Sequence, residues 1–391
     1  MKRTNYEDRC PVCAAHSVAA FLCREQVPVH QNLVIRDQQA AVGIARGDLE
    51  LAVCEECGFI FNRAFEPLRL SYGGDYENTQ ACSPFFRAYL DTLVSYLILE
   101  KGVRNSHIVE VGCGDGLFLR SLVEAEGAGN SGYGFDPSYT GPASDLEGRL
   151  QFQKRDYGPE CVGVFTDVVV CRHVIEHVPD PLGLLRTIRL ALANSPHARV
   201  FLETPCVEWI LRNQVIWDFF YEHCSYFTAE SLTTAFQASG FRVEDVRHVF
   251  GGQYLWVEAT VAKQGAAMAR DPGSIPALAR QFLELEGDLE GGWQTRIQQL
   301  ACKGKVALWG AGAKGVTFAN LIDPTLQWID CVVDLNPKKR GHYVPGTGHP
   351  IVGYQELADR GVTVAILMNP NYRHENLALL RTAHLDIDLI E

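Results

Sequence analysis

The feature that most constrains the fold is an apolar strand that ends in a cluster of glycines, inside the stretch from Ser106 to Pro137. The sequence His-Ile-Val-Glu-Val at 107–111 runs into the turn Gly-Cys-Gly-Asp-Gly at 112–116 and then into a helical pattern at 117–122. Glycines let the backbone turn tightly and approach a ligand without a Cβ in the way. A second predicted strand at 132–135 ends in Asp136, an acceptor suited to ribose hydroxyl groups. The stretch therefore predicts a nucleotide-binding βαβ unit.

Two classes of cofactor fit this geometry, and the charge of the turn separates them. NAD prefers a fuller glycine pattern, with its pyrophosphate over a helix N-terminus. Here two acids, Glu110 and Asp115, would repel a pyrophosphate but suit the positive amino group and sulfonium of S-adenosylmethionine. The turn resembles motif I of the class I methyltransferases. That resemblance implies that S-adenosylmethionine is bound by Glu110, Gly112, Gly114, Asp115, Gly116 and Asp136.

Length and charge bound the architecture and the partners. With 391 residues the chain is long enough for two or three domains. It carries 35 basic and 47 acidic residues, a net charge of −12, which disfavours nucleic acid and anionic membrane as partners. No apolar run reaches the length of a membrane span, and the N-terminus lacks an apolar signal core. We therefore expect a cytoplasmic protein.

Four of the 13 cysteines form two C-x-x-C pairs near the N-terminus. Two thiolates from each pair can complete a tetrahedral zinc site, and four protein ligands make such a site structural rather than catalytic. A thioredoxin-like redox pair is the alternative, but it lacks its βαβ context here. We expect residues 1–75 to form a zinc module whose ligands are Cys10, Cys13, Cys54 and Cys57.

Several polar residues of the expected central domain, residues 76–263, fall where ligands bind in α/β sheets. Tyr76 lies in a polar loop upstream of the glycine turn, where a lid over a pocket would lie. Asp156 follows the third predicted strand and is expected to meet the adenine. Arg172 and His173 directly follow the fourth strand, and residues beyond a strand's carboxyl end face the ligand crevice. His177 comes next, with a structural histidine bonded to the backbone as the alternative.

An aromatic stretch at 217–228 holds the adjacent pair Glu222 and His223. Adjacent residues of an extended segment point to opposite sides, so only a turn lets both face one substrate. A Glu-His pair next to a helix start is a candidate acid/base site above the cofactor. The alternative for His223 is a buried histidine that fixes the loop.

The C-terminal part, residues 277–391, opens with an amphipathic helix and contains a second glycine turn. We expect the apolar stripe of this helix to pack within the chain, with dimerisation as the less favoured alternative. The turn Gly-Ala-Gly-Ala-Lys-Gly at 310–315 completes a dinucleotide pattern, so NAD binding must be considered. Lys314 favours a phosphate-bearing ligand, and Pro-Lys-Lys-Arg-Gly at 337–341 adds cations. Together they look like a grip for a diphosphate.

The whole pattern resembles the sugar C-methyltransferases, which make branched deoxysugars on nucleotide-linked 4-keto intermediates in antibiotic biosynthesis. The resemblance covers nearly the whole chain, and its most specific matches are the segments 172–177, 222–227, 310–315, 337–341 and 345–347. It implies an α/β fold with a class I methyltransferase core, a small zinc module and a second Rossmann-like domain. It also implies a structural zinc, S-adenosylmethionine bound by the central domain with help from Asp156, Arg172 and His173, and a nucleotide-sugar between the central and C-terminal domains. The implied substrate contacts are Tyr76, Tyr221, Lys314, Lys338 and Arg340.

Two departures from that family are visible. Its members commonly carry Tyr-His-Glu-His where this chain has Phe-Tyr-Glu-His at 220–223, so one active-site hydroxyl is missing or moved by a residue. Its members also often have a Ser-Asn-Asp form of the cofactor turn, whereas residues 112–116 show the commoner methyltransferase form.

The resemblance implies deprotonation of a carbon next to a ketone, followed by attack of that carbon on the methyl group. We expect His223 as the base, Glu222 as its orienter or as acceptor for a substrate hydroxyl, and His173 or His177 near the developing oxyanion. Tyr76 could lend a proton. The alternatives are a methyltransferase of a non-sugar small molecule, an NAD-dependent oxidoreductase, or a non-catalytic zinc-bearing scaffold. The expected assembly is a monomer or a weak dimer.

Overall fold

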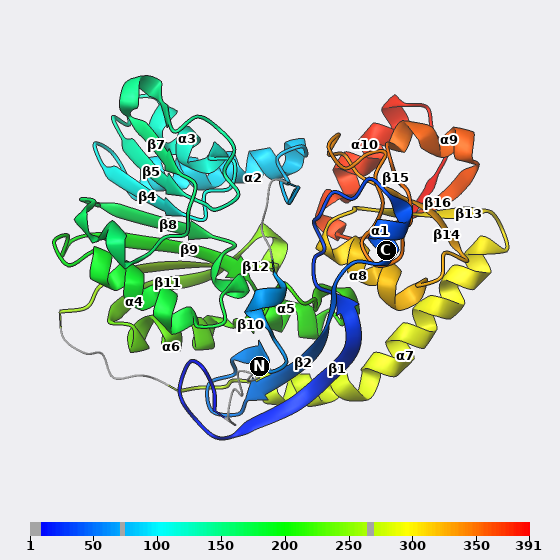
Figure 1. Cartoon of the computed structure of the whole chain (residues 1–391), viewed down its shortest axis with the longest axis horizontal. Helices are drawn as coiled ribbons and strands as arrows, with labels where there is room; N and C mark the ends of the chain where they lie inside the picture. Colours follow the sequence, from blue (N-terminus) through cyan, green and yellow to red (C-terminus); the bar gives the residue numbers. More distant parts are fainter. Residues whose placement is uncertain (1–8, 71–74, 264–269) are drawn as a thin grey trace.

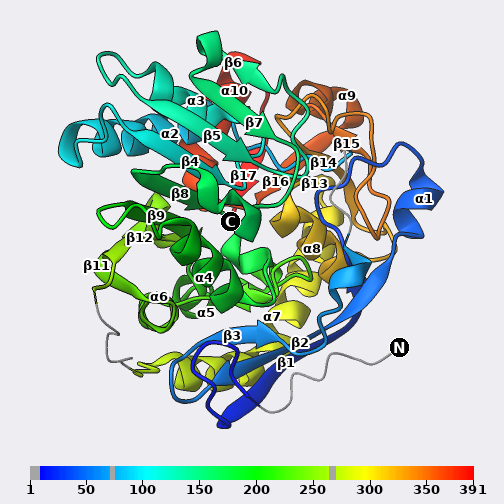
Figure 2. The ribbon, with the colours of Figure 1, turned by 60° about the vertical axis from the view of Figure 1, so that its left-hand side comes forward.

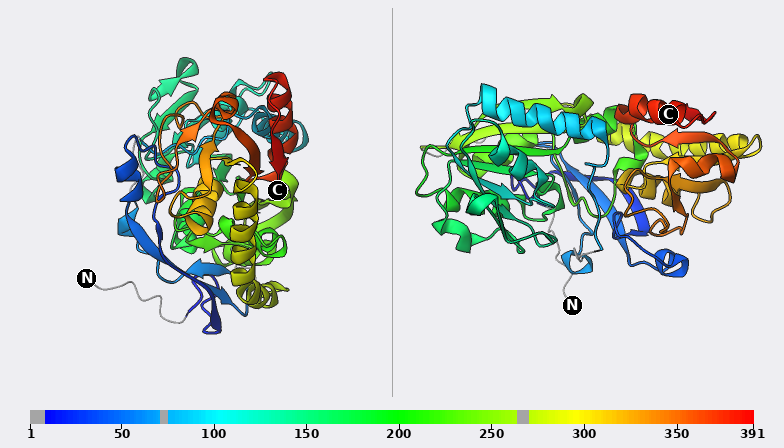
Figure 3. Two further views of the ribbon diagram at one scale, coloured as in Figure 1. Left: turned by 90° about the vertical axis from the view of Figure 1, so that its right-hand side faces the viewer. Right: turned by 90° about the horizontal axis from the view of Figure 1, so that it is seen from above.

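Three β-sheets organise the molecule. The structure is a computed structural model that describes residues 9–70, 75–263 and 270–391. A central eight-stranded sheet and a C-terminal five-stranded sheet lie side by side, and the long N-terminal strands pass beneath the gap between them (Figures 1 and 3). None of the helices in these described ranges is long and apolar enough to cross a membrane.

The central sheet has the strand order β11-β12-β9-β8-β4-β5-β7-β6. Strands β4, β5, β7, β8 and β9 are parallel, β12 runs antiparallel to β9, and β11 runs antiparallel to β12. Their bounds are β4 (His107–Val111), β5 (Ser131–Phe135), β6 (Ser144–Asp145), β7 (Leu150–Gln153), β8 (Val168–Arg172), β9 (Arg199–Pro205), β11 (Phe241–Val249) and β12 (Tyr254–Val261). The middle strands are buried on both faces, which explains their almost unbroken apolar sequences.

Helices cover both faces of this sheet. They are α2 (Pro84–Ser95), α3 (Leu117–Glu124), α4 (Pro181–Ala191), α5 (Val207–Arg212) and α6 (Ala229–Ala238). Helices α2, α4 and α6 are capped by Ser83, Asp180 and Thr228, which precede them and whose side chains accept a hydrogen bond from a first-turn amide. The α/β core expected from the sequence is confirmed.

The C-terminal sheet is fully parallel, with the order β15-β14-β13-β16-β17. Its strands are β13 (Lys305–Trp309), β14 (Ile329–Val333), β15 (Ile351–Val352), β16 (Val362–Leu367) and β17 (Asp388–Ile390), and its helices are α8 (Ala313–Ile322), α9 (Leu357–Arg360) and α10 (Arg373–Thr382). The long helix α7 (Ile275–Ala301) precedes it. Phe282 and Ile297 of α7 are buried, and Leu278, Leu289 and Trp293 pack against the same core, so the apolar stripe is used within the chain.

The N-terminal sheet connects the other two. It contains β1 (Val18–Pro28), β2 (Arg46–Cys54), β3 (Ile60–Asn62) and the short β10 (Ser225–Tyr226), with helix α1 (Gln38–Val42) between β1 and β2. Because β10 comes from residues far beyond 75, this sheet is completed by the central part of the chain, and the division into three domains stays a prediction. Figure 2 shows β1 and β2 running along α7. Arg24 of β1 forms an ion pair with Glu286 of α7 at 2.8 Å.

Candidate active site

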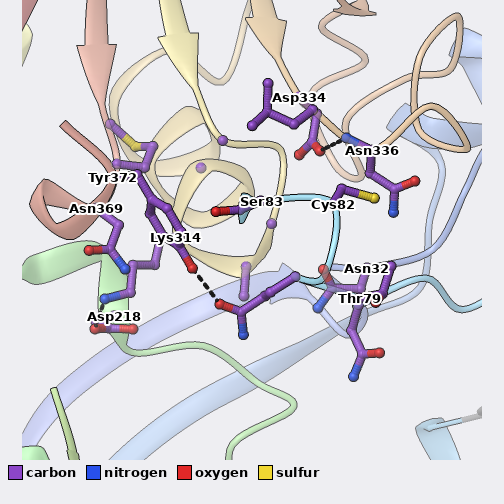
Figure 4. Close-up of a pocket in the computed structure, with 18 of the residues that line it drawn as sticks. Asn32, Thr79, Cys82, Ser83, Asp218, Lys314, Asp334, Asn336, Asn369 and Tyr372 are labelled. Carbon is purple, nitrogen blue, oxygen red and sulfur yellow. Dashed lines mark hydrogen bonds and ion pairs between the residues drawn. The ribbon is translucent and has the colours of Figure 1, made fainter. Parts of the chain in front are cut away.

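A cavity of about 290 Å³ lies between the central and C-terminal sheets. From the central part it is lined by His173, Glu176, His177, Glu222, His223 and Tyr254. From the C-terminal part it is lined by Gly310, Gly312, Lys314, Asp334, Lys339 and Tyr372. Asn32 and Tyr76 complete this selection of the lining from the N-terminal side. Figure 4 shows Asn32, Asp218, Lys314 and Asp334 converging on the space.

The central glycine turn requires its glycines. Gly112, Gly114 and Gly116 have φ of +70°, +55° and +80°, a region that side chains with a Cβ rarely adopt. A Cβ at Gly112 would lie 2.1 Å from Cγ2 of Val174, and one at Gly114 would meet nothing within 4 Å. The backbone of Gly114 therefore offers a ligand an open approach. Its N–H donates to Oδ2 of Asp136 at 2.9 Å, and Oδ1 of Asp136 accepts from the amide and the hydroxyl of Ser138. Oδ2 therefore keeps one lone pair for a ribose hydroxyl.

The acids around this turn differ sharply in environment. Glu110 is buried, and its Oε2 accepts a hydrogen bond from the amide of Leu119 at 3.1 Å. Burial raises the pKa of Glu110 to about 8, although the positive charge of Arg172 acts in the opposite direction. Asp115 is exposed and accepts from the amide of Leu117 at 3.1 Å, and Asp156 is exposed as well. At pH 7 the Glu110 carboxyl is therefore largely protonated, and the negative charge that the sequence predicted for this pair comes mainly from Asp115.

Arg172 is the last residue of strand β8, and His173, which follows it, lines the cavity. Arg172 forms an ion pair with Glu203 at 2.6 Å and lies over the ring of Phe118 at 4.5 Å. Within the described part of the chain its buried Nη2 has no hydrogen-bond partner, and a buried unpaired donor indicates a place for a ligand acceptor. The binding of the cofactor by Arg172 stays a prediction, because Arg172 is not among the described residues that line the cavity.

His173 faces the cavity with an unusual backbone, at φ +53°. Its Nδ1 lies 3.2 Å from Glu176 Oε1, and its Nε2 lies 3.5 Å from Glu203 Oε1 without hydrogen-bond geometry. Burial lowers the pKa of this imidazole, but the carboxylates of Glu176 and Glu203 outweigh burial and raise the pKa to about 9. His173 is therefore a positive charge beside the cavity at neutral pH.

Glu222 and His223 are adjacent in the sequence, and both line the cavity because the backbone turns at this point. The amide of His223 donates to the carbonyl of Phe220 at 3.2 Å and closes this turn. The Glu222 carboxylate is fully buried; Oε1 lies 2.9 Å from Nδ1 of His30, and Oε2 accepts from the Tyr76 hydroxyl at 3.3 Å. The hydrogen bonds of Glu222 thus lead to the N-terminal segment and to Tyr76.

His177 and His223 form a pair on the cavity wall. Their rings are nearly perpendicular, at 83°, with centroids 4.6 Å apart. Nδ1 of His177 donates to the carbonyl oxygen of Glu222 at 3.0 Å. Burial, followed by the charges of His177, His173 and Lys314, holds the pKa of His223 well below its usual value of 6.5. His223 is therefore a neutral imidazole at pH 7 and can accept a proton.

The second glycine turn borders the same cavity from the other side. Gly310 has φ +120°, and a Cβ at Gly315 would lie 1.8 Å from the carbonyl oxygen of Gly310. Asp334, at the end of β14, accepts from the amide of Ala311 at 2.8 Å. Lys314 reaches across the gap to Asp218 of the central part at 2.7 Å, as Figure 4 shows.

Three of the expected substrate contacts are turned away from the cavity. The Lys338 side chain is 72% exposed and pairs with Glu77. The Arg340 guanidinium donates to the carbonyls of Asp334 and Leu335. Tyr221 is fully buried, and its hydroxyl accepts from the amide of Glu66 at 2.9 Å. None of these three is among the described residues that line the cavity, because each is held by a partner elsewhere.

Lys339 of the cavity lining, and His30 outside that lining, make contacts that the sequence did not reveal. Lys339, between the two expected cations, is buried and donates to Asn32 Oδ1 and to the carbonyl of Ala311, both at 3.0 Å. His30 holds Glu222, although no spacing in the sequence connects residues 30 and 222. The run of three cations at 338–340 could have indicated that this segment binds a ligand, but not that Lys339 is the member that points inward. Nothing in the sequence indicates a role for His30.

The four cysteines of the C-x-x-C pairs gather into one buried cluster. The Sγ atoms of Cys10 and Cys57 lie 3.6 Å apart, those of Cys13 and Cys54 lie 3.5 Å apart, and all four lie within 4.8 Å of one another. Four thiolates about 2.3 Å from a tetrahedral zinc ion would be separated by about 3.8 Å. The donor set and its spacing therefore fit zinc.

Comparison with known proteins matches two parts of the chain. A methyltransferase domain profile matches residues 85–246, and the profile of the C-methyltransferase C-terminal domain matches residues 292–384. The C-methyltransferase NovU of Streptomyces niveus is 26% identical over 389 residues, which cover 94% of this chain and 91% of that protein.

Two further similarities cover less of the chain. The ubiquinone biosynthesis O-methyltransferase of Vibrio campbellii (strain ATCC BAA-1116) is 34% identical over 116 residues, 27% of this chain and 48% of that protein. The crystal structure of N,N-8-amino-8-demethyl-D-riboflavin dimethyltransferase (RosA) from Streptomyces davawensis covers 46% of this chain and 55% of its own, with 18% identity and a TM-score of 0.36. The profiles and the full-length relative agree with the α/β core and its glycine turn, and the chain is thus an S-adenosylmethionine-dependent methyltransferase that is similar to C-methyltransferases.

Proposed function

We propose that this enzyme methylates a carbon next to the ketone of a nucleotide-linked 4-keto deoxysugar. The observation that carries the proposal is the cavity itself, which is bordered on one side by His177, Glu222 and His223 and on the other by the glycine turn of the C-terminal sheet. A keto sugar attached to a nucleoside diphosphate needs both an acid/base site and a phosphate site within one molecule's length.

The cofactor is held, in this proposal, by the central turn. Asp136 accepts the ribose hydroxyls, the open backbone at Gly114 lies against the ligand, and Arg172 offers its unpaired Nη2 to an acceptor. Gly112 and Gly116 shape the turn, Asp115 supplies negative charge, the largely protonated Glu110 lies buried beneath it, and Asp156 approaches the adenine. When bound, S-adenosylmethionine supplies an electrophilic methyl group.

The base in this proposal is His223, which takes the α-proton at a ring nitrogen. A carbon acid next to a ketone is much weaker than a protonated imidazole, so the enolate oxygen needs stabilisation as the proton leaves. His173 is suited to that task because its pKa of about 9 keeps it positive at neutral pH. His177 and Tyr76 line the same cavity and contribute hydrogen bonds.

Glu222 and His30 act together as a positioning pair. A buried carboxylate needs hydrogen bonds, and His30 supplies one to Glu222 at 2.9 Å. We expect His30→Leu to lower kcat by about tenfold, because the Glu222 carboxylate would lose the hydrogen bond from His30 and reorient. His30→Asn, whose amide nitrogen can replace Nδ1, should recover most of the loss with little change in KM. An equal loss in both variants, or a change in KM alone, would reject the pair.

The nucleotide side of the substrate is assigned to the C-terminal turn, with Lys314 and Lys339 as the cations nearest to a diphosphate. Both line the cavity, whereas Lys338 and Arg340 lie outside the lining. Lys314 holds Asp218 and Gln253 across the gap, so a phosphate at this position would compete with a contact between the central and C-terminal parts.

We also propose that the four cysteines hold one structural zinc ion. Zinc bound by four thiolates leaves no open position for chemistry. Cys54→Ser should lose the metal together with folded protein, because the binding free energy of such a site contributes to folding. Elemental analysis decides the matter, since a well-folded parental protein that contains no zinc would contradict the assignment.

The function is tested by methyl transfer to a panel of nucleotide-linked keto sugars, followed by intact mass and by NMR of the product. The proposal predicts a mass gain of one methyl group and a new carbon–carbon bond next to the ketone. A methyl group on oxygen or nitrogen would refute carbon transfer. If the enzyme methylates only ketones that are not sugars, the substrate is another small molecule and the sugar proposal is wrong.

A further inference from the structure

Three side chains on the cavity wall combine donor atoms that metalloenzymes use. Glu176 and His177 are neighbours in a single helical turn, η5 (Ile175–His177), and His223 lies opposite them on the turn before β10. One ligand atom from each of the three lies within 4.8 Å of the other two. Metal bonds of about 2.1 Å at tetrahedral angles place ligand atoms about 3.4 Å apart, so the groups would close by at most about 1.4 Å.

Two of these side chains, His177 and Glu176, are held in place by hydrogen bonds to other groups of the protein, as metal ligands usually are. The carbonyl oxygen of Glu222 can only accept a hydrogen bond, so Nδ1 of His177 carries the proton and the lone pair is on Nε2. The Glu176 carboxylate is fixed by His173 Nδ1 at 3.2 Å and by the Thr204 hydroxyl at 3.1 Å. Each carboxylate oxygen keeps a second lone pair.

The donor set and the position of the three residues identify the kind of site. Two imidazoles and one glutamate form the protein ligands of several catalytic zinc sites, which leave the fourth position open. All three residues line the cavity, so the open position faces solvent or substrate. We propose that Glu176, His177 and His223 form a second metal site, separate from the four cysteines, for a first-row transition-metal ion such as zinc or cobalt.

Occupation of this site has a consequence for turnover, which rests on the proposed function. A metal ion bound to His223 uses the lone pair that would take the substrate proton, and it also draws His177 and Glu176 inward. The site therefore acts as an inhibitory metal site. Free transition-metal ions and the keto substrate would compete for the same corner of the cavity.

The metal site itself is tested without any methyl acceptor. Cobalt(II) is titrated into the full-length protein with its cysteine-bound metal left in place, and the absorption spectrum is followed. We expect one additional saturable site with visible cobalt absorption but without the thiolate charge-transfer band of a cysteine site. That absorption should be lost in His177→Gln and in His223→Gln, each shown to be folded by circular dichroism and by binding of S-adenosylhomocysteine.

His248→Gln is the matched control, because His248 is an exposed histidine on β11, outside the cavity lining. Its cobalt spectrum should equal that of the parental protein. The site is refuted by the absence of saturable visible absorption, by a spectrum that carries the thiolate band alone, or by equal spectra in the parental protein and both cavity variants.

The inhibitory role is tested separately, with any methyl acceptor that the enzyme turns over. Saturating cobalt should lower turnover by roughly 10²-fold, the contribution of a general base, and a chelator should restore it. Turnover that is unchanged or higher with the site filled would refute inhibition while leaving the metal site in place. A failure of the proposed sugar substrate would appear instead in the uninhibited parental enzyme.

Discussion

The two glycine turns of this molecule share a backbone design but differ in charge. In the central turn, Asp136 accepts from the amides of Gly114 and Ser138 at 2.9 and 2.7 Å. In the C-terminal turn, Asp334 accepts from the amides of Ala311 and Asn336, both at 2.8 Å. In each turn an acid at the end of the second strand thus secures the loop after the first.

The side chains around the two turns diverge. Two residues before the first glycine, the central strand has the buried acid Glu110, whereas the C-terminal strand has the buried Leu308. The central turn continues with the exposed Asp115, and the C-terminal turn has Lys314 at the cavity. The comparison teaches that two turns with the same backbone design can carry opposite charges, Asp115 at one and Lys314 at the other. A cationic cofactor at the first turn and an anionic substrate at the second are what this difference predicts.

The largest effect is expected when the acid that secures each turn is replaced by alanine. Asp136→Ala should weaken binding of S-adenosylmethionine by roughly 1–3 kcal/mol, because charge-assisted hydrogen bonds to the ribose are lost. Asp334→Ala is the matched variant and should leave that affinity within about twofold, while raising KM for the nucleotide-linked acceptor. Calorimetry with S-adenosylhomocysteine measures the first effect. Equal losses of cofactor affinity in both variants would break the comparison.

A second test compares two neighbouring lysines of the C-terminal part. Lys339→Met should raise KM for the acceptor by roughly tenfold, about 1.4 kcal/mol, because a buried cation at the cavity is removed. Lys338→Met is the control and should have little effect, since that side chain is 72% exposed and pairs with Glu77. Steady-state kinetics at saturating cofactor distinguishes them. A larger effect at Lys338 would indicate that the diphosphate binds at the outer surface instead of in the cavity.

The smallest expected effect is the change in the rate of methyl transfer as the pH is lowered. The depressed pKa of His223 keeps its imidazole neutral below pH 6.5, so the proton acceptor persists as the pH falls and is lost only below the folded-state pKa. Single-turnover methyl transfer should therefore change by less than about twofold between pH 8 and pH 6.5. A loss of half the rate near pH 6.5 would indicate an ordinary, solvated histidine.

Much of the fold followed from local patterns in the sequence. The central strands and the first glycine turn are visible because apolar runs, glycines and a terminal acid occur at fixed short spacings. The amphipathic stripe of α7 also predicted packing within the chain, and Phe282 and Ile297 are buried there. The pairing of β10 with β3 was not predictable, because a two-residue strand carries no periodicity.

The candidate site was predictable where its residues follow a strand and not where distant segments meet. His173, His177, Glu222 and His223 all line the cavity, although their chemical roles stay predictions. Tyr221 differs from its neighbours because the turn that points Glu222 and His223 inward points its ring toward Phe65. The contact between His30 and Glu222 depends on tertiary packing, which no local pattern encodes.

The central claim is that carbon–hydrogen bond cleavage occurs at His223, in the cavity between the two turns. Solvent deuterium exchange at the α-carbon of a nucleotide-linked keto sugar, followed by NMR without methyl donor, tests it directly. The account predicts exchange by the parental enzyme and a loss of about 10²–10⁴-fold in His223→Asn, with S-adenosylhomocysteine binding retained. A folded His223→Asn enzyme that exchanges the α-proton at the parental rate would contradict it.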